Sequence, residues 1–146
     1  MRIRRLSLKE VEYTAFEMAK QLMTWDEPIP EFGTRYPNVL ESCIGAPFQT
    51  FHQKPLYKKL TGKAAILFYL MIKNHPFENG NKRIAVMTLF VFLYLNRKWL
   101  KVSNEALYQF AVSIAESKSK SKDTYISAIN DFLNKNLIDF SPISKR

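Results

Sequence analysis

Two long apolar stretches, 64–72 and 84–95, do most to limit what this chain can fold into. Both are apolar on nearly every side at helical spacing, and helices of this kind sit in the middle of a bundle. The longer stretch has 12 residues, whereas a membrane-spanning helix needs about 20. The sequence therefore predicts a buried helix pair at the centre of an all-α protein, with no membrane partner.

Helix signals flank this pair on both sides. Ser7 and Glu10 have the spacing of a capping box, in which each side chain bonds the backbone of the other residue. Pro37 suits the first turn of a short helix, and Ser103 suits the cap of a later one. We expect about six helices, over 8–25, 37–44, 56–74, 82–96, from 103 onward and after the basic run 118–122, with a loop or small hairpin over 48–55.

Length and cysteine content indicate one intracellular domain. The chain has 146 residues, and domains most often have about 100–150. A single cysteine, Cys43, cannot form an intrachain disulfide, which fits a reducing compartment. The basic start is followed by a charged amphipathic segment rather than by the apolar core of a signal peptide. We therefore expect a cytoplasmic protein, with a loose tail from about residue 140.

A polar stretch, His75-Pro76-Phe77-Glu78-Asn79-Gly80-Asn81-Lys82-Arg83, separates the two apolar stretches. Its Asn-Gly-Asn sequence favours a tight turn, after which a helix begins near residue 82. The free N–H groups and the positive dipole end of a helix N-terminus bind phosphate. Glycine permits close approach, and a lysine and an arginine add two cations. The pattern predicts an anion site at this turn.

A histidine beside an anion site completes a set of groups that is able to transfer a phosphate. Histidine is the side chain that most readily exchanges a proton near neutral pH, so His75 is a candidate general base. Phe77 alternates with His75 and is expected to anchor the loop in the core. Taken singly, each of these residues is most often structural. Their joint occurrence within nine residues favours transfer of a phosphoryl or nucleotidyl group to a hydroxyl.

This stretch resembles the signature of the Fic/Doc family, His-x-Phe-x-(Asp/Glu/Asn)-Gly-Asn-x-Arg. The general Fic pattern has Gly where this chain has Lys82, and a second Arg where it has Val86. The ending Gly80-Asn81-Lys82-Arg83 is similar to the death-on-curing (Doc) branch. The resemblance covers about residues 36–96 and implies a single Fic/Doc domain over 1–146, a bundle of about six helices with a small β-hairpin flap.

The resemblance also implies a role for each matching residue. His75 would be the general base, and Asn79 falls where many members have an acidic Mg²⁺ ligand. Gly80 and Asn81 would shape the anion hole, while Lys82 and Arg83 would act in catalysis and hold the nucleotide phosphates. The flap that aligns the target would consist of Phe48, Gln49, Thr50 and Phe51.

The function that the resemblance implies is that of a toxin from a toxin–antitoxin pair. Such a protein would use ATP and Mg²⁺ to move the γ-phosphoryl group to a Ser, Thr or Tyr hydroxyl of a target protein, with translation as the affected process. The inhibitory pattern (Ser/Thr)-x-x-x-Glu of many Fic proteins does not occur in the sequence. A separate antitoxin is therefore expected, and the net charge of +9 suits an acidic antitoxin segment. Nucleic acid is not required.

Two alternatives remain open at this point. One is transfer of AMP instead of phosphate, since the loop is compatible with either orientation of ATP. The other is a catalytically silent basic module that binds nucleic acid or a partner protein, which explains the charge but not His75. Ordinary structural or solvated roles are favoured for His52, Cys43, Asp26, Glu27, Glu31 and the run 118–122. A metal role is left open for one of the three acidic residues in this list.

Overall fold

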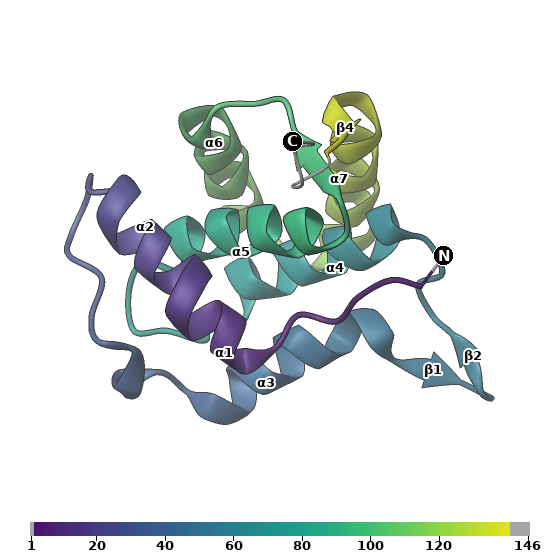
Figure 1. The fold of residues 1–146 in the computed structure, drawn as a ribbon, viewed down its shortest axis with the longest axis horizontal. Coiled ribbons are helices and arrows are strands. Elements are labelled where there is room, and N and C mark those ends of the chain that lie inside the picture. The colour runs from purple at the N-terminus through teal and green to yellow at the C-terminus, as the bar shows by residue number, and fades with distance from the viewer. Residues whose placement is uncertain (1, 141–146) are drawn as a thin grey trace, which may run out of the picture.

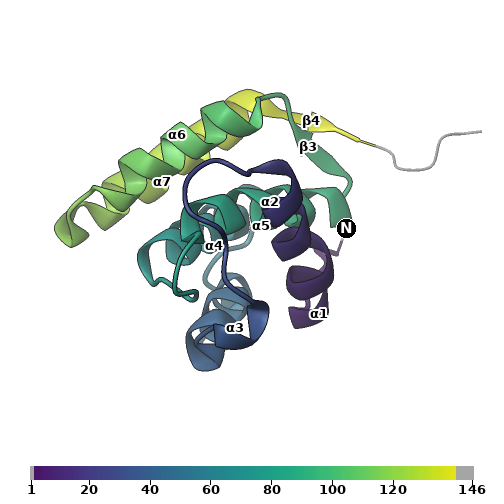
Figure 2. The same cartoon turned by 90° about the vertical axis from the view of Figure 1, so that its left-hand side faces the viewer.

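The computed structural model describes residues 2–140, which form three layers of helices (Figures 1 and 2). The middle layer is the antiparallel pair α4 (Leu60–Lys73) and α5 (Asn81–Leu95). Both helices are buried along most of their length, as the two apolar stretches predicted. α4 begins four residues later than expected, because Lys59 at its start has extended backbone and residues 57–59 belong to a loop.

The chain enters the bundle through one continuous helix with a wide central segment. It consists of α1 (Leu8–Glu10), the π-helical segment η1 (Val11–Phe16) and α2 (Glu17–Leu22). The capping box is present as predicted, since Glu10 N donates to Ser7 Oγ at 3.1 Å and Ser7 N donates to Glu10 Oε1 at 2.9 Å. The π-helical turns were not foreseen. They bury Val11, Ala15 and Phe16 against α5.

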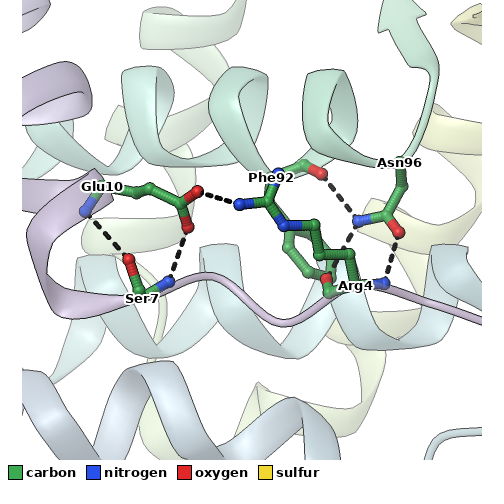
Figure 3. A network of polar contacts seen from close by, with 5 residues as sticks. All are labelled: Arg4, Ser7, Glu10, Phe92 and Asn96. Atoms are coloured by element: carbon green, nitrogen blue, oxygen red, sulfur yellow. Dashed lines mark hydrogen bonds and ion pairs between the residues drawn. The ribbon is translucent and has the colours of Figure 1, made fainter.

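The segment before this helix is tied to the far end of α5 (Figure 3). Arg4 N donates to Asn96 Oδ1 at 2.6 Å, and Asn96 Nδ2 donates to Arg4 O at 3.1 Å and to Phe92 O at 2.9 Å. The Arg4 guanidinium reaches the Glu10 carboxylate at 2.5 Å, so the capping box and this bridge form one network. The amide of Asn96 thereby satisfies the backbone of two segments that are distant in sequence.

On the side of the middle layer opposite to the two C-terminal helices, the chain runs from α2 through a short helix to a hairpin at the edge of the molecule (Figure 1). A 3-10 turn, η2 (Phe32–Thr34), precedes α3 (Pro37–Gly45), and a second one, η3 (Ala46–Phe48), follows it. β1 (Thr50–Phe51) then pairs antiparallel with β2 (Lys54–Pro55). His52 and Gln53 at the turn both have positive φ, 52° and 65°, as a two-residue type I′ hairpin turn requires. The predicted hairpin is therefore present.

The C-terminal layer packs α6 (Asn104–Ala115) and α7 (Lys122–Asn136) over the buried pair. Ser103 caps α6 as predicted, accepting from Ala106 N at 3.0 Å. A second strand pair, β3 (Lys98–Leu100) with β4 (Leu137–Asp139), was not predicted from the sequence. Phe140 packs on Tyr94 and Trp99, while residues 141–146 of the expected tail lie outside the described residues.

The architecture confirms the all-α prediction. Counting residues 8–22 once, the described part of the chain has six α-helices and two short strand pairs. In residues 2–140, no helix is both long and apolar enough to span a bilayer. The loop that joins α4 to α5 lies at one end of this helix pair, and the hairpin β1–β2 lies at the other end (Figure 1).

Candidate functional site at the start of helix α5

The loop between α4 and α5 holds His75 in an unusual backbone conformation. His75 follows the C-cap residue Asn74 and has a φ of 52°, in the left-handed region. This conformation costs a non-glycine residue roughly 1–2 kcal/mol. Its side chain is exposed, whereas Pro76 and Phe77 immediately after it are buried. The turn thus exposes the imidazole at the point where the chain returns to the core.

The side chain of Asn81 holds this loop through two hydrogen bonds to the backbone of Phe77. Its Oδ1 accepts from Phe77 N at 2.9 Å, and its Nδ2 donates to Phe77 O at 2.8 Å. The same Nδ2 lies 3.5 Å from Nδ1 of His75. Phe77 is 2% exposed and packs against Phe16 and Phe32 with ring centroids 5.5 and 5.9 Å apart. The position of the imidazole is therefore linked, through one amide, to an aromatic cluster in the core.

Gly80 ends the loop and caps α5. Its φ of 79° is left-handed, a conformation that glycine adopts without strain. The first helical hydrogen bond runs from Ile84 N to Gly80 O at 2.9 Å, so the N–H groups of residues 81–83 point beyond the helix end. Lys82, half-buried in the same turn, adds a cation. The N-terminus of α5 is consequently a positively charged corner beside His75.

Arg83 lies beneath this corner and is almost completely buried, at 3% exposed. Its guanidinium donates to the carbonyl oxygens of Met23 at 3.3 Å and Glu27 at 2.6 Å. Arginine has five N–H donors, so two such bonds leave donors for another acceptor. In this structure Arg83 joins α5 to the segment that follows α2.

That segment, residues 23–30, folds back over the start of α5 and is called the cover below. Asn79 Nδ2 lies 3.5 Å from the carbonyl oxygen of Pro28. Ile29 lies directly against Gly80, because a Cβ added to Gly80 would be 2.7 Å from Ile29 Cγ1. Together with the two carbonyls on Arg83, these contacts place the cover against Asn79, Gly80 and Arg83, three residues of the predicted nucleotide site.

A small cavity of about 20 Å³ remains between the cover and the helix end. This is room for about one water molecule. It is lined by Asp26, Tyr108 and residues 79–83. Burial, with the nearby Asp26 carboxylate second, raises the pKa of the Tyr108 phenol, whose oxygen is 3.4 Å from Asp26 Oδ2. A larger cavity of about 230 Å³ shares Asp26 and Arg83 with it and is also lined by Lys20.

Trp25, also in the cover, contributes an unsatisfied donor near this corner. Its indole ring packs edge-on against the Tyr108 ring with centroids 5.3 Å apart. Its Nε1 is buried and has no hydrogen-bond partner among the described residues. The cover therefore holds this indole close to the Tyr108 side chain.

The structure does not bring the predicted flap to His75. The hairpin precedes α4 and His75 follows it, and a helix of 14 residues is about 20 Å long. Figure 1 agrees, since the hairpin and the α4–α5 loop lie at opposite ends of the helix pair. Phe48 lies in η3 rather than in a strand, and Gln49 joins it to β1. Phe48, Gln49, Thr50 and Phe51 therefore lie away from His75 in this structure, and their role in aligning a target stays a prediction.

The cover, and not the hairpin, lies against the start of α5. Residues 26–30, which include two prolines, were expected to follow the end of the first helix, with a metal role left open for Asp26 or Glu27. Their contacts with Asn79, Gly80 and Arg83 span more than fifty positions, and no local pattern announces such a contact. Tyr108, on α6, was missed for the same reason.

The remaining sequence predictions converge on one corner. His75, Asn79, Gly80, Asn81, Lys82 and Arg83 all lie within the loop and the first turn of α5. An exposed imidazole lies beside a helix N-terminus and two cations, with an amide between them. This arrangement is suited to holding a phosphate chain and removing a proton from an incoming hydroxyl.

Comparison with known proteins identifies relatives of this chain. A family model described as the Fic/DOC family matches residues 7–93. A curated protein named Toxin Doc, from Mycolicibacterium smegmatis (strain ATCC 700084 / mc(2)155), is 32% identical over 66 residues. The match covers 45% of this chain and 51% of that protein, or about half the length of the relative. No solved structure matches the chain.

Proposed function

Because the chain belongs to the Fic/DOC family, we propose that it transfers the γ-phosphoryl group of ATP to a hydroxyl of a target protein. The observation that carries this proposal is the position of His75. Its imidazole is exposed next to the positively charged start of α5, and the Asn81 amide links it to the core. A base and a phosphate-binding helix end are the two parts that such a transfer needs.

The proposed step uses the residues of this corner only for positioning and proton transfer. The target hydroxyl gives its proton to the His75 imidazole, and its oxygen forms a bond to the γ-phosphorus. The bond from that phosphorus to the β,γ-bridging oxygen breaks, and ADP leaves. The N–H groups of residues 81–83, with Lys82 and Arg83, would neutralise the charge on the phosphate oxygens.

Mg²⁺ fits the donor set at this corner when it is carried by the nucleotide. The Asn79 amide and the Asp26 carboxylate line the same small cavity, and Mg²⁺ favours oxygen ligands combined with substrate phosphates. Asn79 is neutral, so most of the ligand charge would come from the nucleotide. The ion would supply charge neutralisation on the phosphates.

Two residues favour phosphoryl transfer over AMP transfer. Lys82 adds a cation at the helix N-terminus, where the general Fic pattern has glycine. Val86, where that pattern has a second arginine, is completely buried in α5 and offers no charge to a nucleotide. AMP transfer would use the same base but would join the hydroxyl to the α-phosphorus and release pyrophosphate.

We also propose that the protein acts as a toxin held in check by a separate antitoxin. The support is the similarity to the protein named Toxin Doc and the family match. The net charge of +9 suits an acidic segment of such an antitoxin, since opposite charge speeds association. The target hydroxyl is expected on a protein that acts in translation.

Labelling with ATP tests the reaction directly. Purified protein is incubated with a bacterial lysate, Mg²⁺ and ATP radiolabelled at the α or the γ position, with His75→Ala as the control. Label in a protein band from the γ position alone is expected. Label from the α position would establish AMP transfer instead. If neither label enters any band above the level of the His75→Ala control, the proposed transferase is wrong.

A further inference from the structure

We infer that the cover, residues 23–30, is a built-in obstruction of the phosphate site, and that nucleotide binds only when it shifts. The inference rests on the proposed function, because it assigns the start of α5 to phosphate. It adds a regulatory element to that site. The structure shows the closed state, in which the cover lies across the helix end on the left-hand side of Figure 1.

The first support is the position of the Ile29 side chain against Gly80. Gly80 lacks a side chain, and that gap is what would let a phosphate approach the helix N-terminus closely. In the closed state the gap is filled by Ile29, whose Cγ1 lies 2.7 Å from the position of a Gly80 Cβ. An apolar side chain and a phosphate oxygen cannot share this space.

The second support is the competition for Arg83. The carbonyl oxygens of Met23 and Glu27 accept from its guanidinium at 3.3 and 2.6 Å. Phosphate oxygens bind arginine through the same N–H groups. Arg83 keeps donors for another acceptor, but its side chain is 3% exposed beneath the cover, so a phosphate chain reaches those donors only when the cover shifts.

The third support is the space that the cover leaves. The cavity at the helix end is about 20 Å³, room for about one water molecule. The adjoining cavity of about 230 Å³ is lined by the cover and reaches Arg83 but none of residues 79–82. The sequence lacks the inhibitory pattern (Ser/Thr)-x-x-x-Glu of many Fic proteins, so the cover would be an obstruction of a different kind. Its closure would lower the apparent affinity by the fraction of molecules that are open.

Binding of ADP to variants of Ile29 tests this inference. Ile29→Ala removes the side chain seated on Gly80, and Ile29→Val removes one methyl group as a milder change. The matched control is Leu22→Ala, a similar truncation seven positions earlier, where the side chain is 55% exposed. Affinity is measured by calorimetry with Mg²⁺, and circular dichroism verifies that each variant is folded.

Ile29→Ala is expected to bind ADP about three- to tenfold more tightly than the wild type, because the closed state loses apolar contact. Ile29→Val should lie between the two, and Leu22→Ala should equal the wild type. Equal affinity in all four proteins would overturn the inference that the cover obstructs the site, but not the proposed function. Weaker binding by the Ile29 variants would also overturn it, since Ile29 would then be part of the nucleotide site. Absence of binding in all four would overturn the proposed function itself.

Discussion

The two ends of α4 use the same device for different purposes. At its C-terminal end, the buried Arg83 donates to the carbonyls of Met23 and Glu27 and so holds the cover. At its N-terminal end, the buried Lys63 donates to the carbonyls of Pro47 at 3.1 Å and Tyr57 at 2.5 Å. Each cation ties a loop to the central helix pair.

The difference lies in what surrounds the two cations. Arg83 lies beneath a helix N-terminus with His75, Asn79 and Lys82 close by in sequence. Lys63 lies 4.6 Å from the ring centroid of Phe48, beneath a hairpin whose residues are exposed. A buried cation bonded to carbonyls therefore does not by itself mark a functional site. The helix end and the exposed imidazole beside it are what distinguish the proposed site from the surroundings of Lys63.

The two histidines give the largest expected contrast between these ends. His75 and His52 are both exposed and both have a φ of 52°, so their replacement by alanine is closely matched. His75→Ala should reduce transfer by about 10²–10⁴, the usual contribution of a general base, while ADP still binds. His52→Ala should leave transfer unchanged. Comparable losses in the labelling assay would show that the hairpin end takes part in the reaction.

The two buried cations should separate stability from binding. Replacing Arg83 or Lys63 by methionine leaves two backbone carbonyls without their donor, which costs about 1–3 kcal/mol in each case. Thermal unfolding should therefore show a lower Tm for both variants. Only Arg83→Met should also weaken ADP binding, by about tenfold or more, because it removes charge from the phosphates. A comparable loss of ADP affinity in Lys63→Met would contradict the assignment of the nucleotide site to the α5 end.

Replacing Gly80 or Gly62 by alanine should change the stability of the protein in opposite directions, by a smaller amount. Gly80→Ala places a side chain at a φ of 79° and against Ile29, which should destabilise the protein by about 1–3 kcal/mol. Gly62 lies inside α4, where an added Cβ would meet only Tyr57 Cβ at 3.8 Å. Gly62→Ala should stabilise by about 0.5–1 kcal/mol. Urea unfolding measures both, and a neutral Gly80→Ala would contradict the packing of the cover.

The smallest expected effect is a pH dependence at the hairpin end. Burial, with Arg5 second, lowers the pKa of the Lys63 amine from 10.5. The unfolded state then binds more protons between the folded and unfolded pKa values, so stability from this group rises with pH in that window. Relative to Lys63→Arg, which stays charged, the wild type should gain stability as the pH rises towards 10.5. A parallel pH profile for both proteins would contradict this shift.

The sequence predicted the parts of this molecule that depend on local pattern. The buried pair α4 and α5 follows from two apolar stretches, and the caps at Ser7 and Ser103 follow from short-range hydrogen bonding. The grouping of His75 with Asn79 to Arg83 needs only a turn followed by a helix. All of these features are determined within about fifteen residues.

The parts that were missed depend on distant contacts. The cover meets Gly80 and Arg83 across more than fifty positions, and β3 pairs with β4 across the whole of α6 and α7. The hairpin is present as predicted, but the length of α4 separates it from His75, so the role of residues 48–51 as a target-aligning flap stays a prediction. A hairpin can be read from its turn, but which site it faces depends on the packing of helices on either side.

Hydrogen exchange with and without ADP and Mg²⁺ tests most directly whether the site lies at the α5 end. Binding is expected to slow exchange at the amides of residues 81–83 and to change it across the cover, residues 23–30. The hairpin and the loop over 48–59 should exchange at the same rate in both conditions. Protection confined to residues 48–59 would contradict the account, because it would place the nucleotide at the other end of α4.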